Sequence, residues 1–566
     1  MRWTLLPQPD AVLVEQLSKE LNVDPILASL LVGRGIDAFA KAKSFFRPSL
    51  EELHDPFLMK GMNEAVHRIQ KAVGNNETIM VYGDYDVDGT TAVALMSSFL
   101  SSFYDKVTTY IPDRYREGYG ISYAGIDYAH DNDISLIIAL DCGIKAIDKV
   151  KYAKEKGIDF IICDHHRPGK FVPDAVAVLD PKQHDCSYPY DELCGCGVGF
   201  KLCQALVQHN DWEFEILIPY LDLVATAIAA DIVPITGENR ILCYHGLNVI
   251  NTSPRAGFKS IIEQVKKNIL DITDVVFIIA PRINAAGRMK HGLYAVDLLV
   301  EQDLDQARLK AKEIDRYNQD RRELDQLITE EALQQIHDNK EEKLFTSVVF
   351  KEDWHKGVIG IVASRLTETH YRPTLVFTKN GDKIAASARS VSGYDVYNAL
   401  EQCSEFIEQF GGHKYAAGLT MQPEQFLNFK KRFEEVVCAT IDKKLLTKEL
   451  KIDALLPLER ITGKLYRILK QMAPFGPRNM RPVFLSRAVY DSGYAKRIGE
   501  NGKHLKLAIK PHVNSSLQIP AIGFNLGDCI SIIQNNKPFD VVYVLEENSW
   551  QGVTSLQLRI KDLKPH

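Results

Sequence analysis

Three carboxylates at alternate positions follow a short apolar run in the segment VYGDYDVDGTTA: Asp84, Asp86 and Asp88. In an extended segment this spacing places the side chains on one face, where they repel one another unless a cation lies between them. Hard divalent cations with oxygen ligands meet that need, whereas a solvated acidic turn would require no metal. Gly89 then allows the chain to turn into the following helix.

Two further apolar runs end in side chains of the same kind. LIIAL ends in Asp141, and IDFIIC ends in Asp164, His165 and His166. Each aspartate alone is explained equally well as a helix cap. Because the carboxyl ends of parallel strands meet at one edge of a sheet, where ligands bind, convergence of all three segments is the simpler explanation. The sequence therefore predicts a metal centre at this edge.

The elements that would position these residues follow an α/β pattern. Short apolar runs alternate with helical stretches at 78–83, 107–111, 134–141, 158–163 and 175–179. Such alternation is typical of βαβ units and a parallel sheet. Residues 302–340 contain no Pro or Gly and repeat apolar residues at helical spacing, which predicts one long helix.

The chain has 566 residues, more than one hydrophobic core supports, so we expect several domains. The expected order is an N-terminal helical cover (1–60), a parallel-sheet catalytic domain (61–300), a connecting helix (301–342), a second α/β domain (343–445) and an OB-type β-barrel (446–566). The barrel is predicted from five β-rich segments joined by short turns.

Composition is that of an ordinary globular protein, with 45% hydrophobic and 25% charged residues. The net charge of −6 argues against a generally basic coat for nucleic acid but leaves room for a local basic channel. No apolar run is long enough for a membrane span, and acidic and proline residues come too early for a signal peptide. We therefore expect a cytoplasmic protein that does not enter a membrane.

Ten cysteines in such a chain indicate reduced thiols rather than a disulfide framework. Cys186, Cys194 and Cys196 raise the possibility of a zinc site. Their Cys-x-Cys spacing differs from the usual Cys-x2-Cys zinc knuckle, and small buried side chains are the alternative interpretation.

The motifs GDYDVDG, LDCG and DHH, in this order and spacing, resemble the DHH phosphoesterase superfamily. Within it, the chain resembles the RecJ family of single-strand-specific exonucleases almost from end to end. The supporting segments are IPDRYREGYG (111–120), ADIVPITGENR (230–240), PRINAAGRM (281–289), WHKGVIGIVASRL (354–366), SARS (387–390), GGHKYAAG (411–418) and APFGPRNMRPVF (473–484). Ala227-Ile228 departs from the family pattern, in which Gly-Thr is usual, and so do Cys194 and Cys196. The resemblance implies a DHH domain, a DHH-associated domain and a C-terminal OB-fold.

The resemblance favours Asp231 over Asp222 as the last metal ligand. The expected ligand set for two ions is Asp84, Asp86, Asp88, Asp141, His165 and Asp231, with Asp141 as the bridge. The mixture of carboxylates and imidazole favours Mn²⁺, with Mg²⁺ as a possible substitute. His166 would contact the scissile phosphate or protonate the leaving group, and Asp164 would orient a histidine.

Several residues are expected to hold the DNA strand. Arg114 would grip a phosphate and Tyr119 would stack on a base. Arg282, Ser387 and Arg389 resemble the family's pocket for a 5′-terminal phosphate, although a surface ion pair is the alternative for each arginine. The remaining candidates are Gly411 and Gly412, whose N–H groups can approach phosphate, the neighbouring His413, and on the barrel Arg487, Lys496, Arg497, Lys503 and Lys506 with Tyr490, Tyr494 and Phe524.

As a function, the resemblance implies a metal-dependent exonuclease that degrades single-stranded DNA from 5′ to 3′ into 5′-mononucleotides, in DNA repair and recombination. One alternative is a DHH-family phosphoesterase acting on oligoribonucleotides or cyclic dinucleotides. A second alternative, from another class, is an inactive DHH scaffold within a replication complex. The expected partner is single-stranded DNA, with a RecQ-type helicase and a single-strand-binding protein as candidate protein partners of a monomer.

Overall fold

The computed structural model describes every residue except 266, 535, 536 and 551, and the chain divides into two compact units. The core unit comprises Glu52–Lys448, and the barrel unit comprises Met1–Glu51 together with Glu449–His566. All the aspartate and histidine motifs quoted above lie in the core unit. Among the described residues, no helix combines the length and apolar character needed to cross a membrane.

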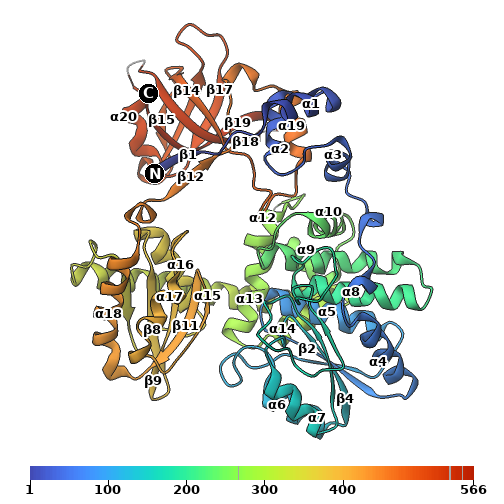
Figure 1. Cartoon of the computed structure of the whole chain (residues 1–566). Coiled ribbons are helices and arrows are strands. Elements are labelled where there is room, and N and C mark those ends of the chain that lie inside the picture. Colours follow the sequence, from blue (N-terminus) through green and yellow to red (C-terminus); the bar gives the residue numbers. More distant parts are fainter. Residues whose placement is uncertain (266, 535–536, 551) are drawn as a thin grey trace. The chain divides into compact units, whose positions relative to one another are not determined.

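A five-stranded sheet forms the centre of the first half of the core unit (Figure 1). Its strands lie in the order β3-β2-β4-β5-β6, and every neighbouring pair is parallel. Their bounds are Thr78–Gly83 (β2), Val107–Tyr110 (β3), Ile134–Leu140 (β4), Asp159–Cys163 (β5) and Ala177–Leu179 (β6). The predicted parallel α/β domain is confirmed. Burial of β2, β4 and β5 along almost their whole length explains their near-continuous apolar sequences.

Helices surround this sheet. They are α4 (Met62–Gly74), α5 (Val87–Ser101), α6 (Tyr123–Asp131), α7 (Ile147–Glu155), α8 (Gly195–His209), α9 (Leu221–Ala230), α10 (Gly237–Thr252), α11 (Ala256–Ile262), α12 (Ile272–Asp274), α13 (Ala280–Met289) and α14 (Leu293–Val300). A 3-10 helix, η3 (Phe214–Tyr220), precedes α9, and a π-helix, η4 (Val275–Ile279), precedes α13. Helix α5 follows β2 directly and is buried along nearly its whole length, so it is a core element with little exposed surface.

A single helix of 35 residues, α15 (Leu304–Asp338), leads to the second half of the core unit. Ala307, Ala311 and Ile314 are buried, in agreement with the helical spacing of apolar residues in the sequence. The second sheet has the order β10-β11-β9-β8-β7, in which only β7 and β8 are parallel. Its elements are β7 (Ser347–Phe350), α16 (Ile359–His370), β8 (Thr374–Asn380), β9 (Lys383–Arg389), α17 (Val396–Glu401), β10 (Gln409–His413), β11 (Ala416–Met421) and α18 (Phe426–Thr440).

The barrel unit is built on seven strands in the order β13-β14-β18-β19-β17-β16-β15, and an additional β14–β16 pairing joins strands from distant places in that order. The elements are β12 (Glu449–Ile452), β13 (Ala454–Leu455), α19 (Gly463–Gln471), β14 (Phe484–Asp491), β15 (Lys496–Ile498), β16 (His504–Lys510), β17 (Ile519–Gly523), α20 (Ile530–Ile533), β18 (Phe539–Trp550) and β19 (Val553–Pro565). All five β-rich segments expected from the sequence form strands, and β13 and β15 are short additions.

The expected N-terminal cover is divided between the two units, and its first 51 residues belong to the barrel unit. They form β1 (Arg2–Leu5), α1 (Ala11–Leu21), α2 (Pro25–Val32) and α3 (Phe39–Phe46). Strand β1 pairs in parallel with β12. Leu17, Leu27 and Leu30 share one core with Phe484 of the barrel. A pairing between residues about 450 positions apart leaves no local signal in the sequence, which is why the spacing of residues could not predict it.

A buried arginine joins helix α4 to three strands of the parallel sheet. Arg68 donates to Glu77 (2.7 Å) and to Asp159 (2.6 Å), and Ser135 also donates to Glu77 (2.6 Å). Burial alone would raise the pKa of Glu77, but the hydrogen bonds from Ser135 and Arg68 outweigh it and lower the pKa to about 2. The ionised Glu77 carboxylate therefore stabilises the start of the sheet.

We expect Glu77→Gln to lower the free energy of unfolding by about 2 kcal/mol at pH 7, because water screens part of the pair. Since the pKa of Glu77 is lower in the folded than in the unfolded chain, its contribution is complete above pH 4.5 and disappears as the pH falls towards 2. Urea unfolding at pH 7 and at pH 3 measures the difference. Glu64→Gln, an exposed site on α4, is the matched control, and an equal loss in both variants would contradict the assignment.

Candidate active site

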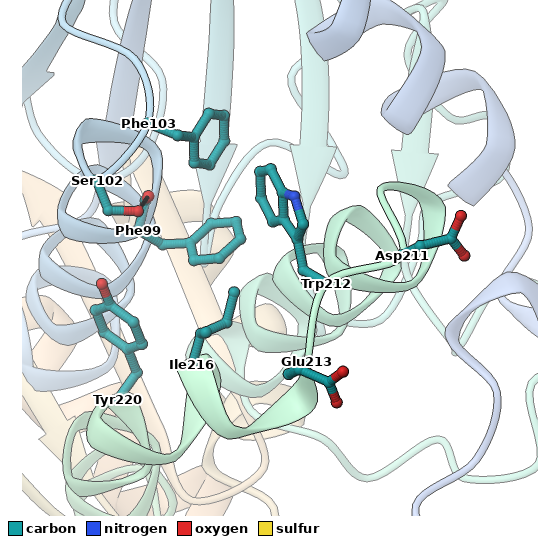
Figure 2. A pocket seen from close by; sticks show the side chains of 8 residues that line it. All are labelled: Phe99, Ser102, Phe103, Asp211, Trp212, Glu213, Ile216 and Tyr220. Atoms are coloured by element: carbon teal, nitrogen blue, oxygen red, sulfur yellow. Dashed lines mark hydrogen bonds between the residues drawn. The ribbon is translucent and has the colours of Figure 1, made fainter.

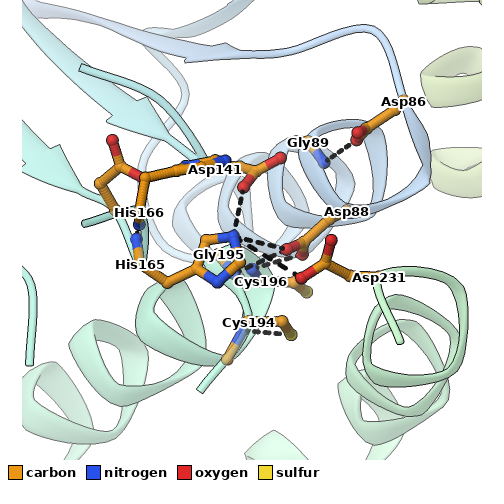
Figure 3. Close-up of polar contacts among 12 residues, drawn as sticks. Asp86, Asp88, Gly89, Asp141, His165, His166, Cys194, Gly195, Cys196 and Asp231 are labelled. Carbon is orange, nitrogen blue, oxygen red and sulfur yellow. Dashed lines mark hydrogen bonds and ion pairs between the residues drawn. The ribbon is translucent and has the colours of Figure 1, made fainter. Parts of the chain in front are cut away.

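The aspartates and histidines singled out in the sequence lie at the carboxyl edge of the parallel sheet (Figure 3). Asp141 follows β4, and His165 and His166 follow β5. Asp231 reaches the same place from the C-terminal end of α9. Three separate elements, β4, β5 and α9, thus bring carboxylate and imidazole groups together at one edge of one sheet.

The segment from Asp84 to Asp88 is not extended, and in this respect the sequence prediction is wrong. Strand β2 ends before it, and Asp86 caps α5 by accepting a hydrogen bond from the backbone N–H of Gly89 (3.1 Å). Asp88 lies in the first turn of that helix. The alternation of three acids fits a strand and a strand–cap–helix junction equally well, so the sequence pattern could not distinguish them.

His165 lies at the centre of the cluster. Its Nε2 atom is 3.2 Å from Asp141, 3.6 Å from Asp231 and 3.8 Å from Asp88. Potential ligand atoms lie within 4.8 Å of one another in two groups, one formed by Asp88, His165 and Asp231 and the other by Asp141, His165 and His166. Asp84 and Asp86 lie outside both groups, but the charge of Asp86 acts on Asp88 and Asp141 of these groups.

The N-terminus of α8 fixes the orientation of Asp88. The backbone N–H groups of Gly195 and Cys196 each donate to one oxygen of this carboxylate, both at 2.7 Å. A Cβ at residue 195 would lie 2.5 Å from the Cβ of Asp141, so only glycine permits this approach. The sequence analysis missed this contact of Gly195 with two aspartates.

Several carboxylate oxygens in the cluster have no hydrogen-bond partner within the described chain. They include both oxygens of Asp84 and one of Asp141, and all are buried. Burial, followed by repulsion from neighbouring carboxylates, raises the pKa of both aspartates well above the usual range. The same causes raise the pKa of Asp88 to about 7 and that of Asp231 to about 8. The protein alone therefore does not stabilise these groups as anions.

A divalent cation fits this cluster, because it would give the unpartnered oxygens a ligand and would compensate their charges. The donors are carboxylate oxygens with one or two imidazole nitrogens, a combination that suits Mn²⁺ and is less typical of Mg²⁺. Asp222, the alternative last ligand, is instead held by Arg255, whose Nε donates to it at 2.9 Å. Of the two candidates, Asp231 is the one in the cluster.

Asp164 orients the second histidine. It accepts hydrogen bonds from Nδ1 (2.7 Å) and from the backbone N–H (3.1 Å) of His166. Burial would raise the pKa of Asp164, but hydrogen bonding and the charge of His166 lower it to about 2. The same interaction raises the pKa of His166 against the opposite effect of burial. The other ring nitrogen, Nε2, lies 3.2 Å from the hydroxyl of Tyr119, whose ring is half exposed.

A cluster of arginines forms a second charged feature of the core unit. Burial, followed by repulsion from Arg114, Arg321 and Arg389, lowers the pKa of Arg288 to about 10. Arg389 donates to the hydroxyl of Ser387 (3.0 Å). Guanidinium groups whose charges repel one another in this way suit an anion, and their planar geometry suits phosphate.

Arg288, on which these charges act, was not named in the sequence analysis, which chose Arg282 of the same helix. Arg282 instead pairs with Asp315 of α15 (2.9 Å) and donates to the carbonyl of Ile278 (2.8 Å). The two arginines lie six residues apart on α13, so they project about 120° apart around the helix axis. The ion pair of Arg282 with Asp315 makes Arg288 the better candidate of the two arginines in PRINAAGRM.

The other residues expected to contact phosphate come from the second sheet. Gly411, Gly412 and His413 lie on β10, at the edge of that sheet, and are exposed. Burial and the charges of His166 and Lys145 lower the pKa of His413. The ring of His413 therefore lies within electrostatic reach of His166, at the edge of the carboxylate–imidazole cluster.

Lys182 is a neighbour that the sequence analysis missed. Its ammonium group donates to the backbone carbonyl of His165 (2.5 Å) and its charge acts on Asp231. The available signal was its position, since Lys182 follows β6 just as the aspartates follow their strands.

The cysteines do not enter the cluster. Within the described part of the chain, neither group of potential metal ligands contains a cysteine. Cys194 accepts a hydrogen bond from the N–H of Gly197 (3.3 Å) and caps α8. Cys194 and Cys196 are buried, as expected from the interpretation that they are small core side chains.

In the barrel unit, the expected nucleic-acid face combines cations with exposed rings. Tyr494 is 75% exposed, and Phe524, 47% exposed, lies under the guanidinium of Arg559 at 5.5 Å. Lys496 pairs in register with Lys506 across β15 and β16. Arg487 and Tyr490 lie on β14, Arg497 lies on β15 and forms an ion pair with Asp528 (3.3 Å), and Lys503 directly precedes β16.

Comparison with protein families identifies three domains. The model of the DHH family, N-terminal domain, matches residues 78–228, that of the DHHA1 domain matches 341–439, and that of the RecJ OB domain matches 452–562. The fold and the site thus define a protein of the DHH phosphoesterase class, with the C-terminal OB domain that the sequence predicted.

Individual relatives identify the family within the DHH phosphoesterase class. The chain is 37% identical over 567 residues to the single-stranded-DNA-specific exonuclease RecJ of Bacillus subtilis, covering 99% of this chain and 70% of that protein. It is 32% identical to RecJ of Salmonella typhimurium, covering 96% of each. The chain therefore belongs to the RecJ family of single-stranded-DNA-specific exonucleases.

A solved structure agrees with this assignment. The crystal structure of RecJ from Thermus thermophilus in complex with Mn²⁺ matches 100% of this chain and 80% of that one, with a TM-score of 0.86 and 28% sequence identity. The same protein in complex with Mg²⁺ matches with a TM-score of 0.79 and 27% identity.

Removing one carboxylate tests whether the cluster binds metal. In the presence of a chelator, Asp141→Asn is expected to be at least as stable as the wild type, because one buried charge is lost. Mn²⁺ at 100 times its dissociation constant would stabilise the wild type by about 2.7 kcal/mol and the variant by less than about 1 kcal/mol. Chemical unfolding with and without Mn²⁺ measures both effects. Asp148→Asn, an exposed site on α7, is the control, and an unchanged response to Mn²⁺ in Asp141→Asn would refute the site.

Proposed function

We propose that this protein is a metal-dependent exonuclease that degrades single-stranded DNA from the 5′ end and releases 5′-mononucleotides, in DNA repair and recombination. The observation that carries the proposal is the presence, in one unit, of a carboxylate–imidazole cluster and a cluster of guanidinium groups. The first suits hydrolysis of a phosphodiester and the second suits retention of a phosphate. The names of the relatives support single-stranded DNA as the substrate.

The proposed metal ligands are Asp84, Asp86, Asp88, Asp141, His165 and Asp231, which would hold two Mn²⁺ ions, or Mg²⁺ in their place. Bound divalent cations would supply charge compensation and a water acidic enough to become a nucleophile. His165 is common to both ligand groups, but its Nε2 atom has one lone pair and can serve only one ion. A carboxylate has two oxygens, so Asp141 is the better candidate for the bridging position.

His166 is the proposed catalytic residue beside the metal ligands. Because Asp164 holds its Nδ1 atom, the Nε2 atom is directed towards Tyr119. From there Nε2 can contact the scissile phosphate or donate a proton to the leaving oxygen. Asp164 is a positioning residue in this proposal, since its carboxylate accepts hydrogen bonds from the ring of His166 and from the backbone N–H groups of His165 and His166.

The arginine cluster would hold the 5′-terminal phosphate. Arg114, Arg288 and Arg389, with the hydroxyl of Ser387, supply the donors, and the N–H groups of Gly411 and Gly412 with His413 would extend the phosphate contacts. Tyr119 would contact the terminal nucleotide. Capture of a phosphate at the strand end would give the enzyme its polarity.

The barrel unit would bind the single strand on its exposed rings and cations. A RecQ-type helicase, a single-strand-binding protein, a monomeric state and a cytoplasmic location are further expectations based on the family resemblance and on sequence composition. The two alternatives remain testable: a phosphoesterase for short oligonucleotides or cyclic dinucleotides would not require the barrel, and an inactive scaffold would not retain a filled set of ligand positions.

A single-stranded oligonucleotide labelled at its 3′ end tests the proposed activity. With Mn²⁺, we expect progressive shortening from the free 5′ end, and no cleavage of a 5′-blocked copy or of a blunt duplex. His166→Ala should lower the rate at least about a hundredfold if the residue assists proton transfer. Cleavage of only very short strands would favour the small-substrate alternative, and absence of cleavage with every divalent metal would favour the scaffold.

The two arginines of α13 provide a matched pair for the phosphate pocket. Arg288→Ala and Arg389→Ala should each reduce the kcat/KM ratio between 5′-phosphorylated and 5′-hydroxyl strands by about tenfold or more, since each removes a charge-assisted contact. Arg282→Ala should leave that ratio unchanged, because its guanidinium pairs with Asp315. If Arg389→Ala kept the wild-type kcat/KM ratio between 5′-phosphorylated and 5′-hydroxyl strands, the proposed phosphate pocket would be refuted.

A further inference from the structure

An open hollow lies at the C-terminal end of α5, opposite the end that carries the aspartates (Figure 2). Its volume is about 600 Å³, within the range of about 300–1,000 Å³ found for ligand-binding pockets. Its apolar lining comes from Phe99 and Phe103 at the end of α5 and from Trp212, Ile216 and Tyr220 in and before η3.

The rings of this hollow pack against one another but remain open to solvent. Phe103 lies 5.0 Å from Trp212 and 5.5 Å from Phe99, measured between ring centroids and in edge-to-face geometry. Phe103 and Trp212 are each 37% exposed, and Ile216 is 42% exposed. Contiguous exposed aromatic and aliphatic groups of this kind are typical of interaction sites, where tryptophan and tyrosine contribute most of the binding energy.

Two carboxylates give the hollow a charge. Asp211 and Glu213 flank Trp212 in the sequence, line the same hollow and are exposed. Within the part of the chain that the structure describes, no hydrogen bond or ion pair engages either carboxylate group. Negative groups at this position repel phosphates and acidic peptides and attract cations.

The hollow is separate from the site of hydrolysis. On α5, Phe99 lies eleven residues after Asp88, which corresponds to about 16 Å along the helix. A nucleic-acid strand would meet the carboxylates with its phosphates, so the charge argues against DNA as the occupant. The proposed exonuclease activity assigns no role to these residues.

We propose that this hollow is a docking site for a partner protein that inserts a large apolar side chain flanked by lysine or arginine residues. The rings of Phe103 and Trp212 would contact the apolar group, and Asp211 and Glu213 would pair with the flanking cations. The proposal is independent of the catalytic assignment, because none of these residues belongs to the metal or phosphate clusters.

The test uses the full chain and a fluorescein-labelled peptide in which one tryptophan and one leucine are flanked by four lysines. Fluorescence anisotropy should show saturable binding, at least about tenfold tighter than that of a copy with glutamates in place of the lysines. The double variant Asp211→Asn/Glu213→Gln should weaken binding about fivefold, and the difference should shrink at high salt. Ile216→Ala should weaken binding of the lysine peptide without changing its salt dependence.

A second double variant controls for non-specific attraction of the cationic peptide. Asp148→Asn/Glu155→Gln removes the same charge from exposed positions on α7 and should bind the peptide as the wild type does. Both double variants should degrade single-stranded DNA at the wild-type rate. Absence of saturable binding, equal affinity for the glutamate peptide, or an equal loss in the control variant would each overturn the proposal.

Discussion

The mutual repulsion of buried carboxylates is the constraint on which the catalytic edge of this protein depends. Asp84, Asp88 and Asp141 are removed from water at the ends of two strands and the start of a helix, where burial disfavours their charged forms. The protein compensates part of this cost with two backbone N–H groups at the positive end of α8. Both oxygens of Asp84 and one of Asp141 have no hydrogen-bond partner within the described chain, so a cation would complete the site.

The arginine cluster shows the opposite imbalance. Arg288 is surrounded by other guanidinium groups, and the buried Asp325 of α15 supplies compensation through Arg321 (3.8 Å) and Arg365 (2.5 Å). One region of the core unit therefore lacks positive charge and another lacks negative charge. Metal ions would supply the positive charge, and the phosphates of a phosphodiester substrate would supply the negative charge. The overall net charge of −6 reveals neither of these two local imbalances.

The sequence predicted the elements well where the hydrophobic pattern was local. The parallel sheet, the long helix and the β-rich C-terminal segments follow from periodicity and length alone. The sequence also predicted that the ligands at the strand ends meet at one edge, because parallel strands place all their carboxyl ends at the same edge of a sheet. The pairing of β1 with β12 was missed, since its two strands are separated by almost the entire core unit.

Within the site, errors arose where one pattern fits two geometries. Alternating aspartates suit a strand, but Asp86 is a helix cap. Two arginines share one motif, and only the contacts of the folded chain favour Arg288, since Arg282 is paired with Asp315. The contacts of Gly195 with Asp88 and Asp141 depend on how α8 packs against the sheet, which is a tertiary property.

The divided barrel unit has a consequence for synthesis. Strand β1 (Arg2–Leu5) emerges from the ribosome before the core unit, but its partner β12 (Glu449–Ile452) emerges only after the whole core unit has been translated. Domains generally fold as units during synthesis, at about 5–20 residues per second. For roughly half a minute or more, the apolar faces of α1 and α2 therefore have no barrel to cover them. The order in which the chain is made thus exposes a hydrophobic surface that the finished molecule conceals, and this interval is when the nascent chain most needs protection from aggregation.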